Sequence, residues 1–347
     1  MPNIIYSKSS GNLDAMFGKL ETPLKVFIEK EASKFEKASS FLKKVFIVEK
    51  SDTFAETIMA QSEFDIFQGM KEGQGPENDS IQQTYKKVIE HLEFGKEFTI
   101  TRTMAEDAKI GVAAEMRRRP SQFIESYYNT REKIAAQALI NGLNKSMTFA
   151  KNEVDLSTYD GLPLFHKDHI FTTDKMKKKA TQSNRYWGAL ESVTAIEEAL
   201  GMGAVAMRNF LNENGEPMEY LADTILIPSN RAKLEMNMKK VVGSERTTGN
   251  DHNDINTQYG NWTLVVVPGW RSDSDKIMLM SSVANRRLSG NMFYNRVPLT
   301  ITNWQDNHTG NYIWNGRCRF GVGFGTYKHI MLIEGSSTAV DGATKLA

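Results

Sequence analysis

The chain has 347 residues, 40% hydrophobic and 24% charged, a composition that is typical of a folded globular protein and excludes a disordered or fibrous chain. Its length allows two domains, and its 43 basic and 42 acidic residues leave a net charge of +1, too small for bulk attraction to nucleic acid. One cysteine excludes an internal disulfide. Neither a signal peptide nor an apolar run long enough to cross a bilayer is evident, so we expect an intracellular protein.

Residues 1–60 are predicted to form an arm. Short apolar patches alternate here with lysines, and Val26, Phe27, Lys30 and Lys34 fall at helical spacing. The apolar stripe of this helix is too narrow to make a core of its own. We therefore expect the arm to dock on another surface, such as a second subunit.

Residues 61–112 are predicted to form a long, protruding, two-stranded loop. Glycines and Pro76 interrupt its first part, whereas Phe98 and Ile100 alternate with threonines as in a strand. An isolated hairpin is only marginally stable in water, so a loop of this length is expected to lie on an outside surface.

Residues 113–184 are predicted to contain a long helix that begins at Pro120-Ser121 and continues for about seven turns, to near Met147. Two adjoining apolar stripes give this helix a broad face, which is suited to packing across a sheet. The stripes are Phe123, Tyr127, Ile134 and Ala138, and Ile124, Tyr128, Ala135 and Leu139. We interpret the two tyrosines as part of this face rather than as residues that stack on nucleic-acid bases.

Residues 185–295 alternate helix and strand signals, which indicates an α+β domain. A helix is predicted over residues 185–211, and Asn214-Gly215 marks a tight turn after it. The remaining predicted elements are strands at 224–228, 262–268 and 276–280, a helix at 230–241 and a mobile polar loop at 243–256.

Residues 296–347 are rich in strand signals. The predicted strands cover residues 298–302, 312–314, 317–324 and 327–333. Glycines between Gly316 and Gly325 punctuate them. Close strand packing explains these glycines better than phosphate binding, because neither a following helix nor a Lys-Ser/Thr pair is evident.

The order of these elements resembles the Hong Kong 97 fold of tailed-bacteriophage major capsid proteins, and local motifs resemble the Mu-like major head subunit family in particular. The motifs are DGLPLFHKDH at 160–169, NGEPM at 214–218, ADTILIPS at 222–229, WTLVVVP at 262–268 and RCRFGVGFGTY at 317–327. Together they place the resemblance over residues 60–333. The first 50 residues match no part of it.

The resemblance implies an α+β capsid fold with five parts. These are an N-terminal arm (1–60), an extended loop (61–112), a peripheral domain with the spine helix (113–184), an axial domain (185–295) and C-terminal strands that return to the peripheral domain (296–347). It implies a structural protein, neither an enzyme nor a cofactor binder, that assembles in hexamers and pentamers into the icosahedral shell around phage DNA. The implied partners are portal, scaffold or decoration proteins and packaged double-stranded DNA, without a membrane. The implied location is the virion capsid, after assembly in the cytoplasm of the bacterial host.

One cluster resembles a metal site. His166, Asp168 and His169, with Asp160 upstream, offer the nitrogen and oxygen ligands that zinc and other divalent ions use. Structural metal sites usually need four ligands, and the six histidines of the chain contain no second such pair. We therefore interpret these residues as loop anchors. A metal-dependent hydrolase using His166 and His169 stays as an alternative of a different class.

Two basic runs are candidates for contacts to DNA phosphates, which would be salt-sensitive and independent of sequence. They are Arg117, Arg118 and Arg119, and the run 175–179 with Lys177, Lys178 and Lys179. A solvated face or an ion pair to a neighbouring subunit explains them as well. An encapsulin, which shares the fold, and a tail-tube protein, which the long helix disfavours, are the other shell or tube alternatives.

Overall fold

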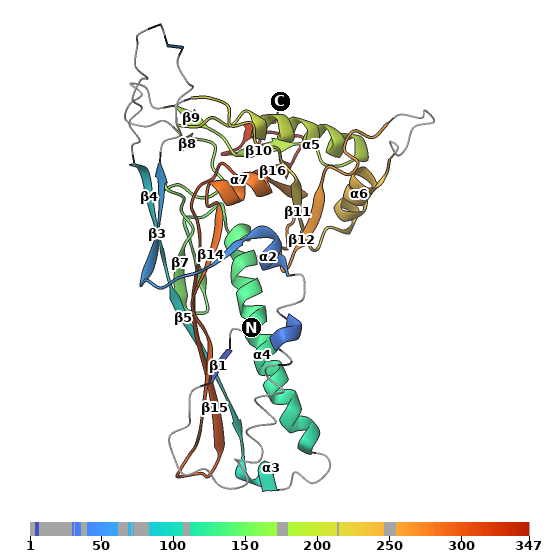
Figure 1. The fold of residues 1–347 in the computed structure, drawn as a ribbon. Helices are drawn as coiled ribbons and strands as arrows, with labels where there is room; N and C mark the ends of the chain where they lie inside the picture. Colours follow the sequence, from blue (N-terminus) through green and yellow to red (C-terminus); the bar gives the residue numbers. More distant parts are fainter. Residues whose placement is uncertain are drawn as a thin grey trace.

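The computed structural model describes residues 4–6, 30, 32–35, 40–61, 69–70, 72, 83–106, 112–171, 180–213, 215–245 and 255–346. These residues form an elongated molecule with two large sheets and three two-stranded ones (Figure 1). A long five-stranded sheet runs beside one long helix, and a six-stranded sheet flanked by helices lies at the other end. No helix of the described part is long and apolar enough to cross a membrane.

The five-stranded sheet joins strands from both ends of the chain. Its members are β1 (Ile4–Tyr6), β2 (Ile47–Lys50), β5 (Leu92–Ile100), β14 (Asn291–Gln305) and β15 (Tyr312–Phe324). β15 pairs antiparallel with β14 on one side and with β5 on the other. β1 and β2 pair parallel with different parts of β14. The sheet is therefore complete only when the first and last parts of the chain meet.

The long helix α4 (Val112–Ile140) lies along this sheet. The predicted start at Pro120 was wrong, because Pro120 lies inside the helix and disturbs it without ending it. The predicted end near Met147 was also wrong. The Asn141 side chain donates to the Gln137 carbonyl, and a Cβ at Gly142 would lie 2.8 Å from the Phe165 ring, so the chain turns there.

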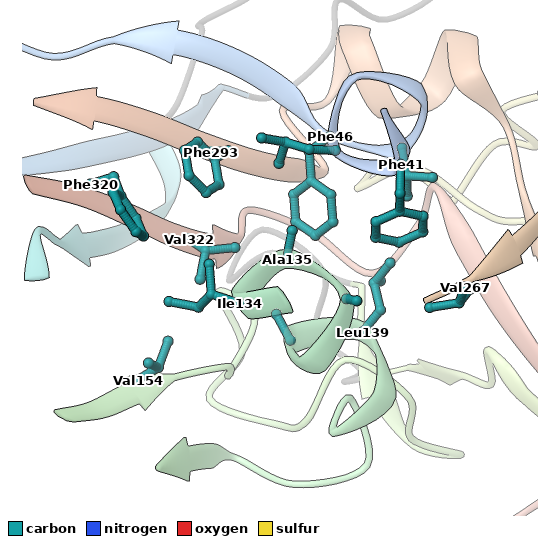
Figure 2. Close-up of a cluster of buried hydrophobic side chains, with 14 of the residues drawn as sticks. Phe41, Phe46, Ile134, Ala135, Leu139, Val154, Val267, Phe293, Phe320 and Val322 are labelled. Carbon is teal, nitrogen blue, oxygen red and sulfur yellow. The ribbon is translucent and has the colours of Figure 1, made fainter. Parts of the chain in front are cut away.

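The main core forms where α4 meets both sheets. Figure 2 shows Ile134, Ala135 and Leu139 of α4 surrounded by apolar side chains from several other elements. These are Phe41 and Phe46 in and after α2 (Phe41–Val45), Val154 of β7 (Asn152–Asp155), Val267 of β12 (Thr263–Val267), Phe293 of β14, and Phe320 and Val322 of β15. The C-terminal half of α4 thus ties the arm to both sheets.

The six-stranded sheet has the order β12-β11-β13-β16-β10-β17. Its strands are β10 (Arg185–Gly188), β11 (Thr224–Pro228), β12 (Thr263–Val267), β13 (Lys276–Met280), β16 (Ile330–Gly335) and β17 (Thr344–Lys345). The helices α5 (Val193–Arg208) and α6 (Ala232–Gly243) pack on it and form a second core, and α7 (Ser282–Arg287) follows β13.

Two predictions about this sheet were wrong. Residues 185–188, expected to begin a helix, form β10 because they pair with β16, and the helix starts only after the Ser192 side chain caps it. The strands β16 and β17 lie in the segment 296–347 that was expected to return as a whole to the first sheet. They pair instead with β10 and β13, so only the part up to β15 returns.

A two-stranded hairpin, β3 (Ala55–Gln61) and β4 (Gln83–Glu90), rises beside the five-stranded sheet (Figure 1). The predicted bounds of the extended loop (61–112) differ from those of this hairpin, because β3 begins in the predicted arm and β5, in the second half of the predicted loop, pairs with β15 in the five-stranded sheet. The loop tip lies largely outside the described residues, as do most of the arm before residue 30, Asn214 of the predicted turn and residues 246–254 of the predicted mobile loop. Smaller elements are α3 (Arg102–Glu106), β6 (Ser146–Phe149), β8 (His169–Ile170) and β9 (Thr181–Gln182).

Candidate functional site

The histidine loop after α4 is built around a buried His169. Its Nδ1 lies 2.7 Å from Asp160 Oδ2, and its Nε2 lies 3.2 Å from the Leu164 carbonyl oxygen. The ring also stacks on Tyr327, with centroids 3.8 Å apart. Both ring nitrogens therefore face oxygen acceptors, and neither has a lone pair directed at an open site.

The neighbours of His169 are engaged in the same way. Burial raises the pKa of Asp160, but hydrogen bonds from His169, Thr158 and the Leu162 amide outweigh it and hold that pKa below its usual value. Burial lowers the pKa of His166, and its Nδ1 accepts a hydrogen bond from the Asp168 amide. The carboxylate of Asp168 itself is exposed.

The weak metal candidates His166, Asp168 and His169 therefore do not converge on one point. Across the described ranges, no group of three His, Cys, Asp or Glu side chains could hold a metal ion. Cys318 is buried in β15, and burial raises the pKa of its thiol to about 12, which leaves it unreactive near neutrality. The loop is an anchor that ties α4 to Tyr327.

The basic runs are only partly described. Arg118 and Arg119 are exposed on α4, and Arg119 Nη1 donates to the Thr99 carbonyl of β5 at 2.9 Å. Arg119 thus also holds α4 against the sheet. The side chain of Arg117 and all of residues 172–179, with Lys177, Lys178 and Lys179, lie outside the described residues.

The glycine-rich strand serves close packing. A Cβ at Gly321 would lie 2.7 Å from the Glu90 carbonyl oxygen, and one at Gly323 would lie 2.8 Å from Ile89 Cδ1. Side chains at these two positions would push β4 away from β15. The glycines therefore let the base of the hairpin lie directly on the sheet.

A polar cluster that we did not predict holds the hairpin where it leaves the sheet. His91 is the residue between β4 and β5, and its Nε2 lies 2.8 Å from the buried Ser51 Oγ. Arg296 donates to the Ser51 carbonyl, and Glu56 is hydrogen-bonded to Ser51. Because Glu56 contacts the serine and not the imidazole, these residues do not form a nucleophile–base–acid relay. They fix the hairpin direction.

A second cluster of this kind joins the arm to both sheets. The Val45 carbonyl accepts hydrogen bonds from the buried side chains of Asn285 (3.0 Å) and Asn291 (3.2 Å). The Asn291 Oδ1 in turn faces His329 Nε2 at 2.8 Å. Sequence reasoning missed both clusters because their members are far apart along the chain.

Several large apolar side chains are exposed in the described part of the chain. Among them, Phe54 and Met59, at the base of the hairpin and in β3, are 75% and 54% exposed. Met236 of α6 and Ile255 are 61% and 82% exposed. Where such side chains gather, they are typical of surfaces that contact other proteins.

Comparisons with known proteins identify the family of the chain. A family model described as phage capsid protein matches residues 84–331. The comparison with curated proteins found no match. A similar solved structure, the capsid of a native GTA particle, is 11% identical with a TM-score of 0.51, covering 95% of this chain and 94% of that chain. The procapsid of bacteriophage JBD30 (15% identical, TM-score 0.48, 95% and 77% covered) and Mycobacterium phage Patience (12%, 0.49, 97% and 94%) are also similar.

Because the family model covers well over half of its length, the chain belongs to the phage capsid protein family. Its fold is the Hong Kong 97 capsid fold, as the resemblance implied. It is a structural protein and not an enzyme. Its place is in the protein shell of the phage particle.

Proposed function

We propose that the chain is a Mu-like major head subunit whose hairpin and arm lie across neighbouring subunits in hexamers and pentamers. The observation that carries this proposal is that only one face of the hairpin is covered by its own subunit. Within the described residues, β3 and β4 pair only with each other, and Ile89 of β4 packs on β15, whereas Phe54 and Met59 are 75% and 54% exposed. A two-stranded hairpin gains little stability by itself in water, so an adjacent subunit is the natural surface for the exposed face.

The proposed parts have distinct positions in the shell. Residues 185–295 surround the five-fold and six-fold centres as the axial domain, and α4 with the five-stranded sheet forms the peripheral domain between them. The exposed Met236 and Ile255 support an axial contact. Obligate interfaces bury on the order of 2,000 Å² or more, and a hairpin and arm lying on neighbours extend that area without enlarging either core.

The remaining partners follow from the same role. The shell would be assembled in the bacterial cytoplasm with a portal and a scaffold or decoration protein, and would enclose double-stranded DNA. Any contact to DNA phosphates would have to be local, because the whole chain carries a net charge of only +1. Shells of an encapsulin would differ by holding a cargo protein instead of DNA and a portal.

The test removes the outer part of the hairpin. Replacing residues 62–82 by Asn-Gly joins Gln61 to Gln83, which are paired in the register of the hairpin, by a two-residue turn. We expect a folded subunit that no longer forms stable shells, as judged by electron microscopy and size-exclusion chromatography. Circular dichroism checks that the fold is kept. Normal, stable shells from this variant would contradict the role of the hairpin.

A further inference from the structure

A pocket of about 210 Å³ lies between the middle of α4 and the five-stranded sheet. Its described walls come from α4, β5, β14, β15 and the turn between β6 and β7, and they include no residue of the β3–β4 hairpin or of the arm. The lining residues that decide its chemistry are Phe94, Lys96, Phe123, Ser126, Leu299 and Cys318.

The pocket exists because α4 crosses the sheet at a glycine. Gly316 of β15 is paired with Lys96 of β5, so no side chain stands next to the lysine on that strand. The Phe123 ring of α4 takes this place, since a Cβ at Gly316 would lie 2.9 Å from Phe123 Cε1 and 3.1 Å from Leu299 Cδ1. The pocket is the space that remains beside this ring.

Both aromatic walls are held by contacts outside the pocket. The Phe94 ring stacks on Phe320 with centroids 4.5 Å apart, and the Phe123 ring contacts Phe98 with centroids 5.2 Å apart. The Cys318 thiol adds no charge near neutral pH, because burial raises its pKa to about 12. The inner part of the pocket is therefore preformed and apolar.

One cation stands at the rim of the pocket. Lys96 is exposed, and its Nζ donates to the Ser126 hydroxyl of α4 at 2.9 Å, which uses one of the three N–H groups of the ammonium. The described lining contains no carboxylate. Glu93 and Glu97 lie at alternate positions of β5, which direct their side chains to the other face of the strand, and Glu93 is paired with Arg317. An apolar body inside and one negative charge at the rim would complement this pocket.

The size of the pocket selects a compact ligand. Pockets that enclose drug-sized ligands measure roughly 300–1,000 Å³, so this one holds a smaller body. Its phenylalanine walls favour a flat ring, because aromatic rings pack well in stacked and edge-to-face arrangements.

We propose that the pocket binds a small aromatic carboxylate. The ring lies against Phe94 and Phe123, and the carboxylate accepts hydrogen bonds at the rim from the Lys96 ammonium and the Ser126 hydroxyl. Such a ligand bridges β5 and α4 and holds the helix on the sheet. The proposal does not depend on the overlap of the hairpin with a neighbouring subunit.

Isothermal titration of 2-naphthoate into unassembled full-length subunits tests the charge at the rim. Lys96→Gln should weaken binding by about tenfold, because it removes a charge-assisted hydrogen bond. The uncharged 2-naphthylmethanol should bind about equally to both proteins. Lys133→Gln, an exposed change on α4 outside the pocket, is the matched control and should leave the affinity for 2-naphthoate unchanged.

Two further measurements locate the ligand. The chain has one cysteine, so selective carbon-13 labelling makes Cys318 alone visible by NMR, and we expect nuclear Overhauser contacts between its β protons and the naphthalene ring. Ser126→Leu fills the pocket from α4 and should abolish binding, whereas Gln137→Leu, an exposed change elsewhere on α4, should not. Urea unfolding checks that each variant is folded, and the exposed Lys96→Gln stays informative if Ser126→Leu folds poorly.

Three results would overturn the proposal. One is the absence of 2-naphthoate binding at concentrations on the order of 1 mM. Another is equal affinity of Lys96→Gln and the unchanged chain for 2-naphthoate. The third is binding without contacts to Cys318, which would place the ligand elsewhere. If 2-naphthoate does not bind and Ser126→Leu prevents shell formation, the pocket receives a segment of a neighbouring copy instead.

Discussion

His329 makes the subunit sensitive to acid. Its ring is fully buried between Gly290 and Asn291, and Nε2–H donates to Asn291 Oδ1, which suits the neutral form. Burial lowers the pKa of His329 from 6.5 to about 3, and the nearby Thr326 backbone opposes this only in part. The folded protein therefore resists a proton that the unfolded chain takes up readily.

The sign and size of the effect follow from these two pKa values. Above pH 6.5 both states are neutral and the full stability is present. As the pH falls below 6.5 the unfolded chain is protonated first, and stability is lost until the pH reaches the folded pKa of about 3. At about 1.4 kcal/mol per pH unit, the loss at pH 4.5 is about 3 kcal/mol, and at pH 3, where the folded form is half protonated, it is about 4 kcal/mol.

The measurement is urea unfolding of unassembled subunits at pH 7 and pH 4.5. His329→Gln keeps a donor for Asn291 but cannot titrate, so its acid loss should be about 3 kcal/mol smaller than that of the unchanged chain, while other groups contribute equally to both. Direct titration of the His329 ring by NMR gives a second readout if the variant folds poorly. Equal acid losses in both proteins, or a ring pKa near 6.5, would refute the reasoning.

Three further perturbations have defined outcomes in urea unfolding at pH 7. Gly290→Ala places a Cβ 2.5 Å from the His329 ring and should cost about 1–3 kcal/mol, so an unchanged midpoint would contradict that close contact. Ile134→Ala empties the centre of the main core and should cost about 2–5 kcal/mol; a cost under about 1 kcal/mol would place Ile134 outside it. Asp160→Asn leaves His169 without its buried anionic partner and should cost about 3–5 kcal/mol, with an unaltered metal content; a neutral effect would show that the pair does not anchor the loop.

Elements with a strong local pattern were predictable. The sequence pattern predicted α4 and the strands β11, β12 and β13 correctly. The spacing of the apolar residues in α4 marks the helix face that is buried, and the continuous apolar runs mark strands in the six-stranded sheet. The ends of α4 were not predictable in this way. Pro120 is typical of a helix start, yet α4 already begins at Val112. At the other end of α4, the chain packs closely on Phe165, which is distant in the sequence.

The site was predictable only where its contacts are local. Asp160 and His169 are nine residues apart, so their role as loop anchors could be inferred from one segment. The pair Ser51 and His91, and the contact of Val45 with Asn285, join residues 40 and 240 positions apart. Only the folded topology brings such residues together, and no spacing rule in the sequence indicates them.

The position of Val45 also sets the order of events on the ribosome. Its carbonyl can accept the hydrogen bonds of Asn285 and Asn291, and β2 can pair with β14, only after those residues have emerged, although α4, the other partner of the arm, is made earlier. At about 5–20 residues per second, 240 residues take roughly 10–50 s to synthesise. A nascent chain therefore cannot complete its five-stranded sheet or its arm early. A chain that is truncated before Asn291 therefore lacks both long central strands of this sheet.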